Sequence, residues 1–285
     1  MFPDRFVYPI REPVNRFIEA LVTNYGGVFR SISAVILQWI VALESGLRWI
    51  PWWLLILVLM GLAAWGTRRA GLAIAVGIMM LGIGVLGLWD RMIQTLALML
   101  LSTLLSVALG IPFGILIAKR SLARTVILPA LDIMQTMPSF VYLLPVLMLF
   151  GLGKVPAVFA TVIYAVPPLI RLTDLGIRQV DGEVVEAARA FGATDRQLLF
   201  GVELPLALPS IMAGINQTIM MALSMVVVAS MIGARGLGEQ VLNGIQTLDV
   251  GKGLEAGIGI VILAVVFDRI TQALGRHQSE RLRRA

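Results

Sequence analysis

The sequence of 285 residues contains no cysteine, a single histidine and few charged side chains, which make up 14% of the residues. Without cysteine there is no disulfide, thiolate metal site or cysteine nucleophile. The one histidine, His277, lies in a polar stretch close to the C-terminus, so we expect no histidine-based triad or zinc site. The isolated serine and aspartate residues form no recognisable catalytic motif, so we predict a protein that is not an enzyme, and we expect no metal or cofactor.

Hydrophobic residues make up 58% of the chain, whereas soluble domains contain about 45–50%. This composition predicts a polytopic membrane protein surrounded by membrane lipid. The formal net charge is +6. In a membrane protein, the positions of lysine and arginine along the chain mainly indicate which loops face the cytoplasm. We therefore do not expect a nucleic-acid partner.

Apolar stretches between charged residues predict an all-α protein with about seven spans, because a transmembrane helix needs about 20 residues. The predicted spans are residues 49–66, 70–89, 94–118, 137–152, 155–172, 208–232 and 255–273. An earlier apolar stretch, residues 31–43, is short, and we expect an interfacial helix there, with an eighth span as the alternative. Prolines interrupt the fourth and fifth spans, so these should be the least regular.

Lysine and arginine gather in the segments that follow the first, third, fifth and seventh predicted spans. The positive-inside rule then places the N-terminus outside and the C-terminus inside. Residues 1–48 become an extracytoplasmic tail, and residues 274–285 become a cytoplasmic tail. In the last span, Asp268 and Arg269 are expected either to pair or to extend toward the interface.

Small residues four apart form one face of the third predicted span. They are Ser102, Ser106, Gly110, Gly114 and Ala118. Such a face lets a neighbouring helix approach closely, so we expect packing within the chain; lining a transport pathway is the alternative.

The segment before the fourth span combines polar, aromatic and proline residues. The residues that lie where the chain would enter the membrane are Gln135, Pro138, Phe140 and Tyr142. Irregular backbone at membrane depth requires protein or water to satisfy it, so we predict part of a pathway or gate. We expect Phe140 to face inward and Tyr142 to pack; a capped helix start with an interfacial tyrosine is the alternative.

Residues 181–205 form the largest predicted inside loop and contain signals for two short helices. Asp181 is placed to cap the first helix, and Gly192 to end it in a left-handed conformation. Thr194 and Gln197 form a capping-box pattern for the second helix, and Pro205 is expected to end the unit.

The same loop contains a spaced motif. Its residues are Glu186, Ala187, Ala188, Gly192, Val202, Leu204 and Pro205. This spacing resembles the EAA loop of ABC importer permeases, with valine at a position where the family has isoleucine. The resemblance implies the type I importer transmembrane fold over residues 90–273, with 49–89 as two accessory spans and 181–205 as the loop that couples to the ATPase.

Four stretches are similar to permeases for quaternary amines, namely glycine betaine, proline betaine and choline. They are residues 132–145, 170–173, 223–227 and 233–238. This resemblance implies osmoprotective or amino-acid transport across a bacterial inner membrane. A permease of the same fold for another solute such as histidine is one alternative; a secondary transporter is another, although no inverted repeat or charged midplane site is visible.

The chain has no phosphate-binding loop of the form GxxxxGK[ST]. The resemblance therefore implies cytoplasmic ABC ATPase subunits as partners, together with a periplasmic or lipid-anchored solute-binding protein. It also implies a second permease subunit, and we expect a homodimer.

Overall fold

The computed structural model describes residues 10–67 and 69–282, and within these residues the chain forms helices without strands. The helices are α1 (Arg11–Trp49), α2 (Trp52–Thr67), α3 (Ala70–Val85), α4 (Trp89–Lys119), α5 (Ser121–Thr136), α6 (Ser139–Phe150), α7 (Lys154–Arg178), α8 (Gly182–Ala190), α9 (Asp195–Leu198), the π-helical turn η2 (Leu199–Glu203), α10 (Leu204–Ser230), α11 (Leu237–Thr247) and α12 (Val250–Leu282). The all-α prediction is confirmed.

Within the described residues, five single helices are long and apolar enough to cross a membrane, and the bent pair α5–α6 makes a sixth. The shorter apolar helices α2 and α3 have 16 residues each. At 1.5 Å per residue such a helix is about 24 Å long, less than a hydrocarbon core of about 30 Å. The first two predicted spans are therefore real helices but shorter than expected.

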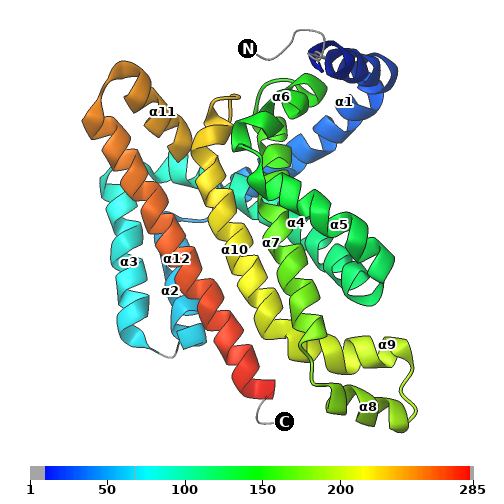
Figure 1. Cartoon of the computed structure of the whole chain (residues 1–285). Coiled ribbons are helices and arrows are strands. Elements are labelled where there is room, and N and C mark those ends of the chain that lie inside the picture. The colour runs from blue at the N-terminus through cyan, green and yellow to red at the C-terminus, as the bar shows by residue number, and fades with distance from the viewer. Residues whose placement is uncertain (1–9, 68, 283–285) are drawn as a thin grey trace, which may run out of the picture.

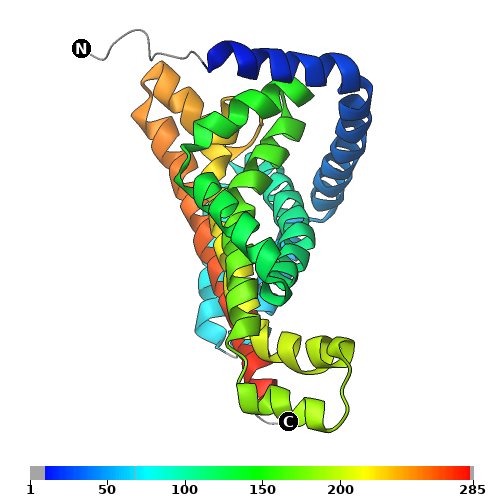
Figure 2. The same cartoon turned by 45° about the vertical axis from the view of Figure 1, so that its right-hand side comes forward.

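The stretch 31–43 is part of α1, a single helix of 39 residues that itself contains a window as apolar as a span. Figure 2 shows the first half of α1 lying across one end of the bundle and the second half running beside it. The second half packs through Ile36, Ile40 and Leu43. The expected interfacial segment thus belongs to a longer helix that packs on the bundle.

Helix α7 occupies the centre of the bundle, with α4 on one side and α10 on the other (Figure 1). A methyl group added at Gly114 of α4 would lie 2.4 Å from Thr173 Cβ of α7. One added at Gly214 of α10 would lie 2.9 Å from a methyl carbon of Leu169. The small residues of α4 therefore serve close packing within the chain, as expected.

The fourth predicted span, residues 137–152, is irregular, as its prolines led us to expect, whereas the fifth lies in one continuous helix, α7, despite its prolines. Helices α5 and α6 meet at Met137 and Pro138 and are bent by 102° relative to each other. Proline lacks the N–H that a continuous helix needs, and it disfavours helical geometry at the residue before it, here Met137 (ψ 133°). The break lies in the proline-containing segment for which the sequence predicted irregular backbone, but the apolar helix after it has only 12 residues.

Candidate functional site

Helices α8 and α9 project from one end of the bundle, between α7 and α10 (Figures 1 and 2). The Asp181 carboxylate caps α8 by accepting a hydrogen bond from the Glu183 N–H at 2.9 Å. Gly192 follows α8 with φ of +83°, a left-handed conformation that glycine adopts without strain. Both signals predicted from the sequence are confirmed.

Helix α9 begins with the expected capping box. The Gln197 N–H donates to the Thr194 hydroxyl at 3.4 Å, and the Thr194 N–H donates to the Gln197 side-chain oxygen at 2.9 Å. Leu198, at the end of α9, is buried. The second short helix is therefore fixed by its own cap at one end and by a buried leucine at the other.

Pro205 does not end this unit, contrary to the prediction. The chain stays helical from Asp195 to Ser230, with the π-helical turn η2 just before Pro205. In a regular helix the proline ring would clash with the carbonyl four residues earlier, and a wider π turn places that carbonyl differently. The second short helix is thus continuous with α10.

The residues of the spaced motif separate into an exposed tip and an anchored base. Glu186, Ala187 and Gly192 are exposed, and Ala188 is half-buried. At the base, Val202, Leu204 and Pro205 are half-buried. Phe191, beside the tip, is 94% exposed, a large aromatic surface that the chain itself leaves uncovered. The tip therefore presents free surface, whereas the base is packed against the rest of the chain.

An ion pair that is buried on one side only, and that the sequence analysis missed, ties the base to α4. Glu203 is only 6% exposed, and its carboxylate pairs with the Lys119 ammonium at the end of α4. Glu203 lies at an unspecified position of the motif, and Lys119 is 84 positions away, so no local sequence signal joins them. The pair links the loop to a second helix of the bundle.

The broken helix pair is also held by charges. Arg124 of α5 lies 3.5 Å from the Asp174 carboxylate of α7, and Arg171 of α7 pairs with Asp132 of α5. Around the break, the predicted pathway residues differ in exposure: Gln135, Pro138 and Phe140 are exposed, whereas Tyr142 is buried. Phe140 therefore faces away from the chain's own core.

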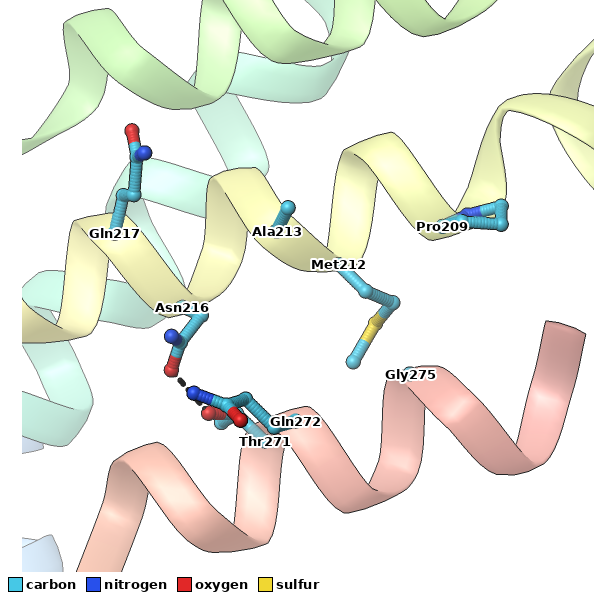
Figure 3. A pocket seen from close by; sticks show the side chains of 8 residues that line it. All are labelled: Pro209, Met212, Ala213, Asn216, Gln217, Thr271, Gln272 and Gly275. Carbon is cyan, nitrogen blue, oxygen red and sulfur yellow. Dashed lines mark hydrogen bonds between the residues drawn. The ribbon is translucent and has the colours of Figure 1, made fainter. Parts of the chain in front are cut away.

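A second polar region lies between α10 and α12, where a cavity of about 410 Å³ opens (Figure 3). Asn216, Thr271 and Gln272 converge on it, and Gln217 extends from another side of α10 (Figure 3). Asp268 accepts hydrogen bonds from the side chains of Asn216 at 2.8 Å and Gln272 at 2.7 Å. Asp268 is therefore held by amides rather than paired with Arg269, whose side chain is exposed.

Residues 110–284 match the family model described as "Binding-protein-dependent transport system inner membrane component". The fold resembles the inward-facing MetNI methionine ABC transporter, with a TM-score of 0.59 over 67% of this chain and 95% of that chain. At 24% identity this likeness concerns the fold alone. It agrees with the type I importer architecture.

Curated relatives match most of the chain. It is 46% identical over 96% of its length to the glycine betaine/proline betaine permease protein ProW of Escherichia coli, covering 77% of that protein. It is 47% identical over 93% of its length to the glycine betaine permease protein OpuAB of Bacillus subtilis, covering 93% of that protein. It is 45% identical over 94% of its length to the glycine betaine/carnitine permease protein GbuB of Listeria monocytogenes, covering 96% of that protein.

Proposed function

The chain belongs to the binding-protein-dependent transport system inner membrane components, and on that premise we propose that it is the permease subunit of an ATP-driven importer for glycine betaine or a related quaternary amine. It is a multi-pass transport subunit and not an enzyme; ATP is hydrolysed on a separate ATPase. The bacterial inner membrane is the location that this function requires.

The observation that carries the substrate proposal is identity of 45–47% to glycine betaine permeases over nearly the whole chain. The other substrate considered from the sequence, histidine, lacks this support, because the relatives described above are named for betaines and carnitine. A secondary transporter is not favoured, because the family depends on binding proteins.

The exposed tip formed by Glu186, Ala187 and Gly192 is the proposed docking element for the ATPase. Small side chains give the tip a low profile, which suits insertion of a helix into a groove on a partner. The anchored base then carries displacement into α10, since η2 and α10 form one helix. In this proposal the tip is cytoplasmic, which places the N-terminus outside and the C-terminus inside.

At the opposite end of the bundle, α11 and the first half of α1 are the elements available to a solute-binding protein (Figures 1 and 2). One chain is proposed to form half of the pathway, and a second copy completes it as a homodimer. Gln135, Pro138 and Phe140 are proposed to line the pathway, because they are exposed at a broken helix where backbone polar groups become accessible.

The test is reconstitution of the purified chain in proteoliposomes with its ATPase and solute-binding protein. ATP-driven accumulation of radiolabelled glycine betaine is compared with that of histidine, and vesicles without the binding protein serve as the control. We expect glycine betaine to accumulate only in the complete system. Accumulation of histidine but not glycine betaine would overturn the substrate assignment, and accumulation without ATP would overturn the importer assignment.

A further inference from the structure

Asp268 lies inside a membrane-spanning segment, since the apolar part of α12 runs from Val250 to Ala273. A carboxylate in a span is energetically costly and faces a protein interior or a water-filled cavity almost without exception. Asp268 is half-buried and does not itself line the cavity between α10 and α12, but it is hydrogen-bonded to Asn216 and Gln272, which do. Its negative charge therefore lies one hydrogen bond behind the polar wall of the cavity.

The partners of Asp268 orient it but do not neutralise it. Asn216 and Gln272 each donate one amide hydrogen bond to the same carboxylate oxygen, Oδ1. The Thr271 hydroxyl in turn donates to the Asn216 side-chain oxygen, which fixes the orientation of that amide. Among the residues that the structure describes, Asp268 has no ion-pair partner. A fixed carboxylate without a counter-cation selects a cationic ligand.

The cavity has the size and lining that a small quaternary amine requires. Its volume of about 410 Å³ falls within the range of about 300–1,000 Å³ typical of small-molecule sites. The lining combines apolar groups, among them Pro209, Met212 and Ala213, with amide and hydroxyl side chains. A trimethylammonium group cannot donate hydrogen bonds, so it suits apolar contacts beside a carboxylate that amides already hold in place.

We propose that the cavity between α10 and α12 is a low-affinity site for the quaternary ammonium solute, with Asp268 supplying the countercharge. The inference rests on the proposed function and extends it to a site outside the α5–α6 break. The cavity's lining residues on α10, from Pro209 to Gln217, belong to the half of that helix that continues from α9. The cavity is therefore placed to hold solute that is leaving on the ATPase side.

Equilibrium dialysis of radiolabelled glycine betaine against the purified permease–ATPase complex, without solute-binding protein, tests the site. The test variant is Asp268→Asn, which keeps the shape and removes the charge. The matched control is Asp249→Asn, which removes an exposed carboxylate next to the other end of α12. The probe for charge is 3,3-dimethylbutanoate, which replaces the cationic nitrogen of glycine betaine by carbon.

We expect weak binding to the wild-type complex and to Asp249→Asn. Binding to Asp268→Asn should be about tenfold weaker, which corresponds to about 1.4 kcal/mol. The isostere keeps the carboxylate but lacks the cationic nitrogen, so it should not compete. Absence of binding to the wild type, equal binding to Asp268→Asn, or competition by the isostere equal to that of unlabelled glycine betaine would each overturn the proposal.

If the Asp268→Asn complex does not elute intact from size exclusion, the proposal is tested on the wild-type complex alone. The deciding result is then whether 3,3-dimethylbutanoate competes with radiolabelled glycine betaine. Purified complex that transports glycine betaine but fails these tests refutes the cavity site and leaves the proposed function standing. Complex that binds glycine betaine through Asp268 but does not accumulate it with ATP would support the cavity site and refute the proposed function.

Discussion

Removing the charge of Lys119 should destabilise the protein more than removing the charge of Glu203, although the two side chains form one ion pair. The reason is their unequal burial: the Lys119 side chain is 36% exposed and that of Glu203 is 7% exposed. Lys119→Met leaves a buried carboxylate without a partner. Glu203→Gln leaves an ammonium group that water can still reach.

Breaking a buried pair from one side typically costs about 3–5 kcal/mol. The free-energy cost of Lys119→Met should be near the lower end of this range, at about 3 kcal/mol, because the exposure of the Lys119 side chain already weakens the pair. Glu203→Gln should cost about 1 kcal/mol, as expected for a pair open to solvent. The double variant should be more stable than Lys119→Met alone, because it contains no buried unpaired charge.

Equilibrium unfolding of the four proteins in mixed micelles with increasing dodecyl sulfate gives these free energies as a double-mutant cycle. Solute transported per ATP hydrolysed, measured on the same proteins in proteoliposomes, should fall in both single variants because the base of the coupling loop loses its tie to α4. Equal destabilisation by the two single substitutions, or a coupling energy near zero, would refute the ion-pair argument.

Gly192→Asp should abolish transport and weaken co-purification of the ATPase while leaving membrane insertion intact, because it places a charged side chain on the exposed left-handed turn. Gly182→Asp, the same change at the exposed start of α8, is the control, and equal transport in the two variants would remove Gly192 from the docking tip. Phe140→Ala should reduce uptake more than Tyr142→Phe, because Phe140 is 53% exposed and Tyr142 is 6% exposed; near-normal uptake in both would exclude this segment from the pathway. A reporter active only in the periplasm should work when inserted next to Lys252 and fail next to Gly192; the reverse pattern would invert the proposed topology.

Local signals in the sequence were sufficient to predict the caps and the turn of α8 and α9. The Asp181 cap, the Thr194 capping box and the left-handed Gly192 each depend on residues within about four positions of one another. Because such interactions need no tertiary context, they appear in the structure as predicted. The small face of α4 was also predictable, since residues four apart must share one side of a helix.

The features that the sequence did not reveal depend on contacts between distant segments. The start of α11 is fixed by the Leu237 N–H, which donates to the Thr95 hydroxyl of α4 at 2.9 Å. The ion pair of Lys119 with Glu203 and the hydrogen bond of Asn216 to Asp268 likewise join separate helices. Periodicity and caps carry no information about which helices become neighbours, so these contacts required the structure.

Cross-linking tests the central claim, that α8 and α9 receive the ATPase, most directly. Because the natural chain has no cysteine, Ala187→Cys introduces a single thiol at the tip and Thr247→Cys a single thiol at the end of α11, on the opposite side of the bundle (Figure 1). In the assembled transporter, a short thiol-to-lysine cross-linker should join the permease to the ATPase through residue 187 and stop ATP-driven uptake. Cross-linking through residue 247 instead, or equally through both positions, would contradict the assignment of this segment as the coupling element.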